Sequence, residues 1–130
     1  MARKWIKFGH ADKAYVHDDA ALKKHWSRLH RGDNEPMPKA ADALNAWRFY
    51  HAGEFQQAVE AGLAAGGSGT NAAIKAQCIY AHYVETNDKS KLALFEEAAA
   101  LAQDRRTAAA KDANAHYLYA LALGRYSQGI

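Results

Sequence analysis

The chain has 130 residues, 17 basic and 14 acidic side chains, and a formal net charge of +3. This length fits one domain with a modest core, and no apolar run is long enough to cross a bilayer. The single cysteine, Cys78, excludes an internal disulfide, and Arg3, Lys4 and Lys7 interrupt the first residues before a signal-like stretch, so we expect a soluble cytoplasmic protein.

The first elements form an N-terminal unit over residues 1–38. Residues 5–16 contain aromatic and β-branched residues around a glycine, which favours a short extended piece or a loose hairpin. Asp18 or Asp19 then caps an amphipathic helix in which Leu22, Trp26 and Leu29 share one face. Residues 33–38 follow, and their two prolines predict a stiff connector without regular structure.

The positive charge is concentrated in this N-terminal third. Residues 1–39 hold nine basic and five acidic residues, whereas residues 40–130 hold eight and nine. Any binding of nucleic acid or another anionic surface is therefore expected here, with Lys23, Lys24, Arg28 and Arg31 as the candidate anion-binding residues. The other interpretation is a solvated helix face, because four acids dilute the charge: Asp18, Asp19, Asp33 and Glu35.

From Lys39 onward alanine becomes frequent, and alanine is the strongest helix former. No alternating run of β-branched residues follows residue 17, so the pattern predicts an all-α fold for residues 39–130. We expect a flexible loop at residues 66–69 between two helical hairpins. The predicted helices cover residues 40–52, 55–65, 71–85, 90–110 and about 112–126.

A repeat with an offset of 34 residues runs through this helical region. The first copy consists of Ala46, Phe49, Gly53, Glu54, Phe55 and Ala58, and the second of Tyr80, Tyr83, Asn87, Asp88, Lys89 and Leu92. A third copy begins near Asp112, at an offset of 40 from the second. Repeats of this length each bury an apolar face only by stacking on their neighbours.

These residues resemble the tetratricopeptide repeat (TPR), whose pattern has a small residue, a bulky aromatic, a Gly-acid-aromatic turn and an alanine. The resemblance implies an α-solenoid of about two and a half stacked antiparallel helical hairpins, with the preceding helix as an N-terminal cap. More finely, residues 20–36 and 112–130 are similar to the N-terminal part of uncharacterised proteobacterial TPR-like proteins, which continue with more repeats. If so, the chain is a bacterial fragment or a shortened version, and its last helix has an apolar face that could form a homo-oligomer.

In TPR proteins the first helix of each hairpin lines a concave groove. The resemblance therefore implies a partner-binding groove in which Trp47, Tyr50 and His51 form an aromatic anchor. The alternative is that Trp47 packs against the Trp26 helix. The family's basic carboxylate clamp is missing, because Ala43 and Ala81 are among the residues at its positions. The groove residues are Trp47, Tyr50, His51, Gln77, Ala81, Glu85, Asn114, Tyr117, Leu121 and Arg125.

Other motifs indicate no catalytic site. Gly62-x-x-x-x-Gly67-Ser68 lacks the lysine and the preceding strand of a phosphate-binding loop. None of the seven histidines is paired with another at a spacing of four, and Cys78 lies mid-helix, where a thiol usually serves as a buried apolar group. We therefore expect no metal, no cofactor and no enzyme activity, and a scaffold-type module for protein-protein interaction that binds a protein or peptide partner.

Overall fold

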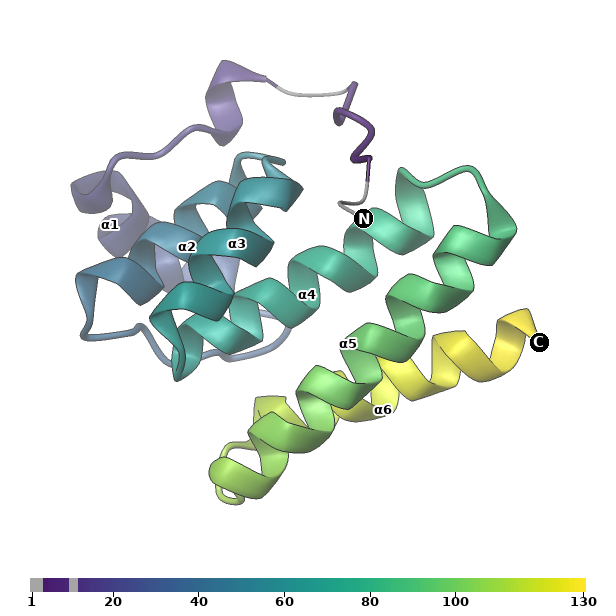
Figure 1. The fold of residues 1–130 in the computed structure, drawn as a ribbon. Helices are drawn as coiled ribbons and strands as arrows, with labels where there is room; N and C mark the ends of the chain where they lie inside the picture. The colour runs from purple at the N-terminus through teal and green to yellow at the C-terminus, as the bar shows by residue number, and fades with distance from the viewer. Residues whose placement is uncertain (1–3, 10–11) are drawn as a thin grey trace.

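Six α-helices and one short 3₁₀ turn make up the computed structural model, which describes residues 4–9 and 12–130 (Figure 1). No strand occurs within these residues, which confirms the all-α prediction. None of these helices combines the length and the apolar character that spanning a membrane requires. The elements are η1 (Lys13–Tyr15), α1 (Asp19–Leu29), α2 (Ala41–His51), α3 (Phe55–Ala65), α4 (Ser68–Tyr83), α5 (Asp88–Ala108) and α6 (Ala113–Gly129).

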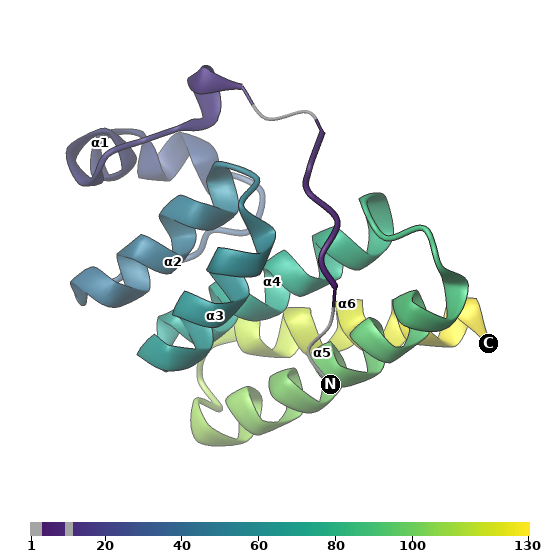
Figure 2. The same ribbon diagram turned by 45° about the horizontal axis from the view of Figure 1, so that its top comes forward.

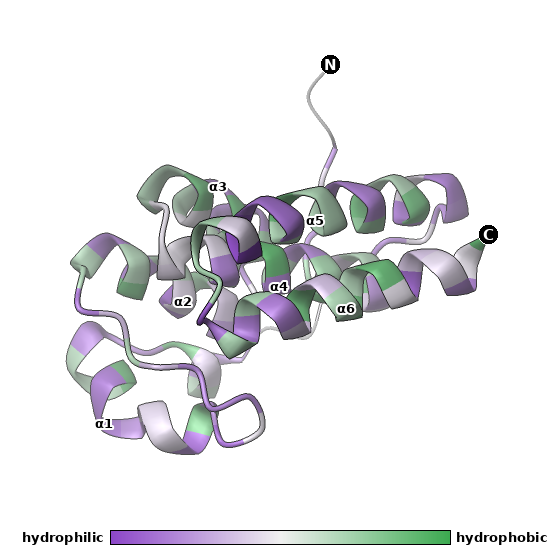
Figure 3. Cartoon of the chain, turned by 90° about the horizontal axis from the view of Figure 1, so that it is seen from below, coloured by the Kyte–Doolittle hydropathy of each residue, from purple (hydrophilic) through white to green (hydrophobic). Residues whose placement is uncertain are grey.

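Helix α4 is the centre of the arrangement. It packs against α2 and α3 on one side and against α5 and α6 on the other, while α1 packs against α2 (Figure 1). Short turns join α2 to α3 and α4 to α5, so consecutive helices lie side by side as hairpins (Figure 2). Hydrophilic residues interrupt the hydrophobic ones along the helices, as expected where one face is exposed (Figure 3).

Side-chain caps fix several helix starts. Asp18 accepts a hydrogen bond from the Ala21 amide at 2.7 Å, as predicted for the start of α1. Asn87 accepts one from the Ser90 amide at the start of α5, and Asp112 caps α6 through the Asn114 amide. The predicted helices beginning near residues 40, 55, 90 and 112 are all present, with ends that differ by a few residues.

The prediction of a loose loop at residues 66–69 was wrong. Only Gly66 and Gly67 form the turn, with φ angles of 70° and 53° that favour glycine, and α4 already begins at Ser68. Gly69 is buried where α4 crosses α3 at Gly62: a Cβ on Gly62 would lie 2.3 Å from the Gly69 carbonyl oxygen. The two glycines in these helices therefore serve a close helix crossing, and the whole α3–α4 turn is tight.

Two clusters of buried side chains form the core. The larger one lies between α3, α4, α5 and α6 and contains Tyr80 and Leu94, both fully buried. The smaller one joins α1 to the body through Leu22, Trp26 and Trp47. The predicted N-terminal unit therefore packs against residues 39–130 through its own apolar face.

The predicted extended piece at residues 5–16 is present in part. Residues 4–9 have neither helix nor strand and run across the body, and η1 forms a single 3₁₀ turn capped by Asp12. His10 and Ala11 lie outside the described residues.

Candidate functional site

An aromatic and histidine cluster occupies the interface between α1 and α2. Trp26 stacks on His30 with ring centroids 4.0 Å apart and meets Trp47 edge-on at 5.9 Å. His51 stacks on Trp47 at 6.2 Å, and its Nε2 lies 2.8 Å from Nε2 of His30. Of the two interpretations of Trp47, the packing against the Trp26 helix is therefore the one observed.

The hydrogen bonds of this cluster fix where its protons lie. His30 Nδ1 is 3.0 Å from Asp33 Oδ1, and because a carboxylate only accepts, His30 donates its Nδ1–H. Its Nε2 then carries the lone pair and accepts Nε2–H from His51. A proton added to His30 would put an N–H on its Nε2, and His51 could then keep the hydrogen bond only by carrying its own proton on Nδ1. Burial lowers the pKa of His30, against the opposing effect of Asp33, and burial together with the nearby His30 lowers the pKa of His51 to about 3.

The connector after α1 is anchored by Asp33. Its second carboxylate oxygen forms an ion pair with Lys75 of α4 at 2.6 Å, and the first also accepts from the Glu35 amide at 3.2 Å. Burial alone would raise the pKa of Asp33, but the hydrogen bonds from Lys75 and the Glu35 amide outweigh it and hold the pKa below its ordinary value. The first residues of the connector are thus tied to α4 by charge.

Glu35 carries the connector into the interior, where its side chain is buried. Its carboxylate accepts from Asn71 at 3.0 Å, from Ser68 at 3.4 Å and from Asn114, so α4 and α6 both hold it. Its carbonyl oxygen accepts the indole N–H of Trp26 at 2.7 Å. Burial raises the pKa of Glu35, against the lowering effect of the two asparagine amides.

The same network continues into the turn between α5 and α6. Asn71 donates to Asp112 at 2.9 Å and accepts from Arg105 Nε at 3.1 Å, and Arg105 also pairs with Asp112 at 3.1 Å. Asn71 is fully buried and uses both its oxygen and its nitrogen. No buried side-chain nitrogen or oxygen among the described residues lacks a partner, so the polar groups of this network are all satisfied.

Four of the predicted groove residues lie in the interior. Trp47, Gln77, Ala81 and Glu85 are buried, at 8% exposure or less, so a partner cannot touch them in this structure. Gln77 donates to the Leu94 carbonyl at 2.9 Å, and Glu85 accepts from the amides after it. The prediction that these four residues line an open wall is corrected: they belong to the core and its polar contacts.

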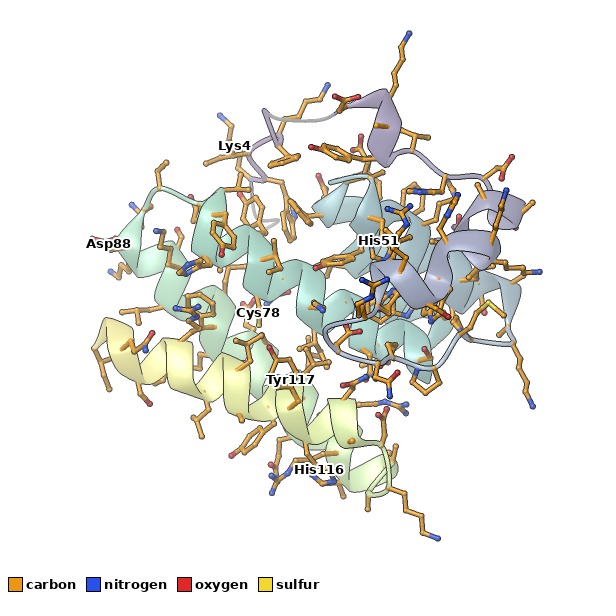
Figure 4. The ribbon with its side chains drawn as sticks, turned by 180° about the vertical axis from the view of Figure 1, so that it is seen from behind. Lys4, His51, Cys78, Asp88, His116 and Tyr117 are labelled. Atoms are coloured by element: carbon orange, nitrogen blue, oxygen red, sulfur yellow. The ribbon has the colours of Figure 1, made fainter. Side chains whose placement is uncertain are left out.

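Four other predicted groove residues are at least partly exposed, Tyr50 on α2 and Tyr117, Leu121 and Arg125 on α6, and we call them, together with Lys75 of α4, the tyrosine face. Tyr117 on α6 is 52% exposed, and it borders a small gap shared with Trp47 and Lys75. Lys75 Nζ lies 5.8 Å from the centre of the Tyr50 ring. The half-buried Leu121 and Arg125 follow Tyr117 at successive turns of α6, and His51, Cys78 and Tyr117 can be located in Figure 4. The tyrosine face comprises Tyr50, Lys75, Tyr117, Leu121 and Arg125.

Two other predicted groove residues lie at its border. Asn114 donates to Glu35, so its amide is engaged with the connector. His51 lines a surface pocket of about 260 Å³ with Tyr15 and Tyr50. Of the ten predicted groove residues, five are therefore engaged within the chain itself: the four buried ones and Asn114.

The candidate anion-binding residues are all on the surface. Lys23, Lys24, Arg28 and Arg31 are exposed on α1 and just after it, away from Trp26, which faces the core. Asp33 and Glu35 are turned inward and paired, so the acids predicted to dilute this charge are partly withdrawn from it.

Cys78 is buried, and burial raises the pKa of its thiol to about 12 against the lowering effect of Arg125. A thiol with that pKa holds its proton at neutral pH and is a poor nucleophile. Among the described residues, no three His, Cys, Asp or Glu side chains are grouped so as to hold a metal ion.

No protein-family model, curated protein or solved structure matches this chain.

Sequence reasoning missed the polar network. Residues 33–38 were predicted only as a stiff connector, yet Asp33 and Glu35 in this connector are members of the network. Its other members, Asn71, Arg105 and Asp112, were not singled out as a group. These five residues come from three separate parts of the sequence, and no repeat or motif spacing links those parts. One signal was present: two acids in a three-residue stretch directly before a proline, between an amphipathic helix and an alanine-rich one.

Proposed function

We propose that this protein is a non-catalytic interaction module that binds a protein or peptide partner on the tyrosine face. In this proposal the hairpins α2–α3 and α4–α5, followed by α6, form a short TPR-like stack. The 34-residue repeat and the side-by-side packing of consecutive helices support that arrangement.

The observation that carries the proposal is the exposure of Tyr117 beside other large side chains. Tyrosine supplies much contact area at a low cost in conformational entropy, and tyrosine and arginine are enriched among residues that dominate interface energies. Tyr117, Leu121 and Arg125 present such side chains along one stripe of α6, and Tyr50 extends it toward α2. The closed polar network beneath them would hold this stripe rigid, which lowers the entropy lost on binding.

Affinity capture with the full chain tests the proposal. The bait is compared with Tyr117→Ala and with the matched control Leu123→Ala, because Leu123 is an exposed side chain on another face of the same helix, at 41%. We expect a partner captured by the wild type and the control and lost with Tyr117→Ala, with affinity reduced about 30-fold for a residue worth about 2 kcal/mol. Equal capture by both variants would contradict the tyrosine face.

Anion binding by α1 is the alternative, supported by four exposed basic side chains. It predicts a different result in the same experiment. Capture would survive Tyr117→Ala, fall with Lys23→Ala/Lys24→Ala, and decrease steeply with added salt.

A further inference from the structure

Residues 4–9 form an N-terminal arm that lies on the body like a bound peptide. In chain order the arm starts near α5 and runs over α4 toward the turn between α2 and α3, where Phe8 contacts Gly53 (Figure 2). Trp5 packs on Tyr80 with ring centroids 4.5 Å apart, and Phe8 packs edge-on against Phe55 at 5.6 Å. The Ile6 amide donates to the Tyr80 hydroxyl at 2.8 Å, so one backbone hydrogen bond lies between the two aromatic anchors.

The Phe8 ring, the second aromatic anchor, occupies a space that a glycine leaves open. Gly53 ends the turn after α2 with a φ of 78°, and a Cβ there would lie 2.5 Å from Cδ2 of Phe8. Any other residue would be strained by this φ and would also push the Phe8 ring away. Gly53 therefore serves the arm as well as the turn.

The arm fills its crevice incompletely. A pocket of about 310 Å³ separates it from the start of α3, and one of about 550 Å³ lies between Ile6, Phe8 and the end of α4. Another of about 420 Å³ opens beside Trp5, between Leu63 of α3 and Leu101 of α5. Ile6 is 41% exposed, so only Trp5 and Phe8 are used as apolar anchors.

We propose that this crevice is a binding site for an extended peptide segment of a partner protein that carries two aromatic side chains three residues apart, and that the arm is its built-in competitor. The recognition elements are the Tyr80 ring and hydroxyl, the Phe55 ring and the space above Gly53. The side chains between the two anchors point to solvent, so the site selects the aromatic pair and tolerates the residues between them.

This site adjoins the tyrosine face at Tyr50, which packs against Phe55 with ring centroids 6.2 Å apart and lines a pocket together with Phe8. It differs from the part of that face on α6, because Trp5 lies between α3 and α5, whereas Tyr117 lies on α6. A tethered arm has an effective concentration in the millimolar range, so a peptide from another molecule must compete with it. A peptide of low affinity or low concentration therefore does not displace the arm.

A fluorescein-labelled peptide with the sequence of residues 4–9 is the probe, and fluorescence anisotropy is the measurement. The receptors are the wild-type chain and the full-length Trp5→Ala/Phe8→Ala variant, in which the arm loses its anchors and the crevice is unchanged. We expect the probe to bind the variant at least about tenfold more tightly than the wild type. A probe with alanine at both aromatic positions should not bind, and adding Tyr117→Ala to the variant should leave the affinity unchanged.

A milder change keeps the test decisive if the double variant does not fold. Ile6→Pro removes the amide proton that the Tyr80 hydroxyl accepts and also restricts the backbone at positions 5 and 6, while both aromatic side chains are retained; Ile6→Ala is its matched control. We expect Ile6→Pro to bind the probe more tightly than wild type and Ile6→Ala to bind as wild type does. Absence of probe binding to a folded double variant, equal binding of the alanine probe, or equal affinities for Ile6→Pro and Ile6→Ala would overturn the proposal.

Discussion

Acidification should destabilise the protein because of His51. The pKa of this side chain is lowered from 6.5 to about 3, first by burial and then by the neighbouring His30, with His17 and Lys75 acting in the same direction. Asp33 opposes them and does not compensate. Protonation therefore favours the unfolded chain, in which the imidazole regains its ordinary pKa.

The size of the effect follows from the two pKa values. The contribution of neutral His51 to stability is fully present above the unfolded pKa and is lost progressively as the pH falls toward the folded value. Between about pH 7 and about pH 5 this linkage amounts to about 2 kcal/mol for His51 alone. The lowered pKa of His30 adds to the loss in the same direction. Asp33, whose pKa is also lowered, contributes only at more acidic pH.

Urea unfolding of the wild type and of His51→Gln at several pH values between these limits measures the effect. Glutamine keeps an N–H donor for His30 and does not titrate, and His116→Gln on the exposed side of α6 is the matched control. We expect a falling free energy of unfolding for the wild type and His116→Gln and a flatter profile for His51→Gln. A wild-type profile that is level over this range, or one that His51→Gln leaves unaltered, would refute the buried histidine pair.

Three further predictions concern the packing. Gly62→Ala places a methyl group against α4, so we expect the free energy of unfolding, measured by thermal unfolding, to fall by about 1–2 kcal/mol despite the better helix propensity of alanine. Gly124→Ala, which places the methyl group in open space, should be neutral or stabilising. Trp26→Ala should lower the free energy of unfolding by about 3–5 kcal/mol. Trp26→Phe mainly removes the hydrogen bond to the Glu35 carbonyl and should lower it clearly less. Equal losses for the two variants would contradict that contact. Cys78 should react with a thiol reagent only on unfolding, so rapid labelling of the native protein would show that the thiol is not buried.

The sequence predicted the helices well because their signals are local. Asp18 and the apolar stripe of Leu22 and Trp26 define α1 within one short segment, and the short turns around Gly53 and Asn87 separate the later helices. The start of α4 was placed too late because four clustered small residues resemble a loop. Only the contact between Gly62 and Gly69 across two helices shows why Gly69 belongs to the helix.

The candidate site was predicted less well because it depends on burial. The TPR resemblance implied that Tyr50, Tyr117, Leu121 and Arg125 line one groove; in the structure Tyr117 is exposed and the other three are half-buried. The register could not show that Glu35 enters the interior, since a carboxylate is normally exposed and its partners are Asn71 and Asn114. A groove inferred from a repeat pattern shows which helix faces align but not what the rest of the chain places over them.

The most direct test of the central claim is to map a captured partner on the protein by NMR. Amide and side-chain signals of the full chain are followed as the partner's binding segment is added. Our account predicts that the perturbed signals cluster on the tyrosine face, at Tyr50, Tyr117, Leu121 and Arg125. Perturbations confined to the exposed basic residues of α1, with the tyrosine face unchanged, would contradict it.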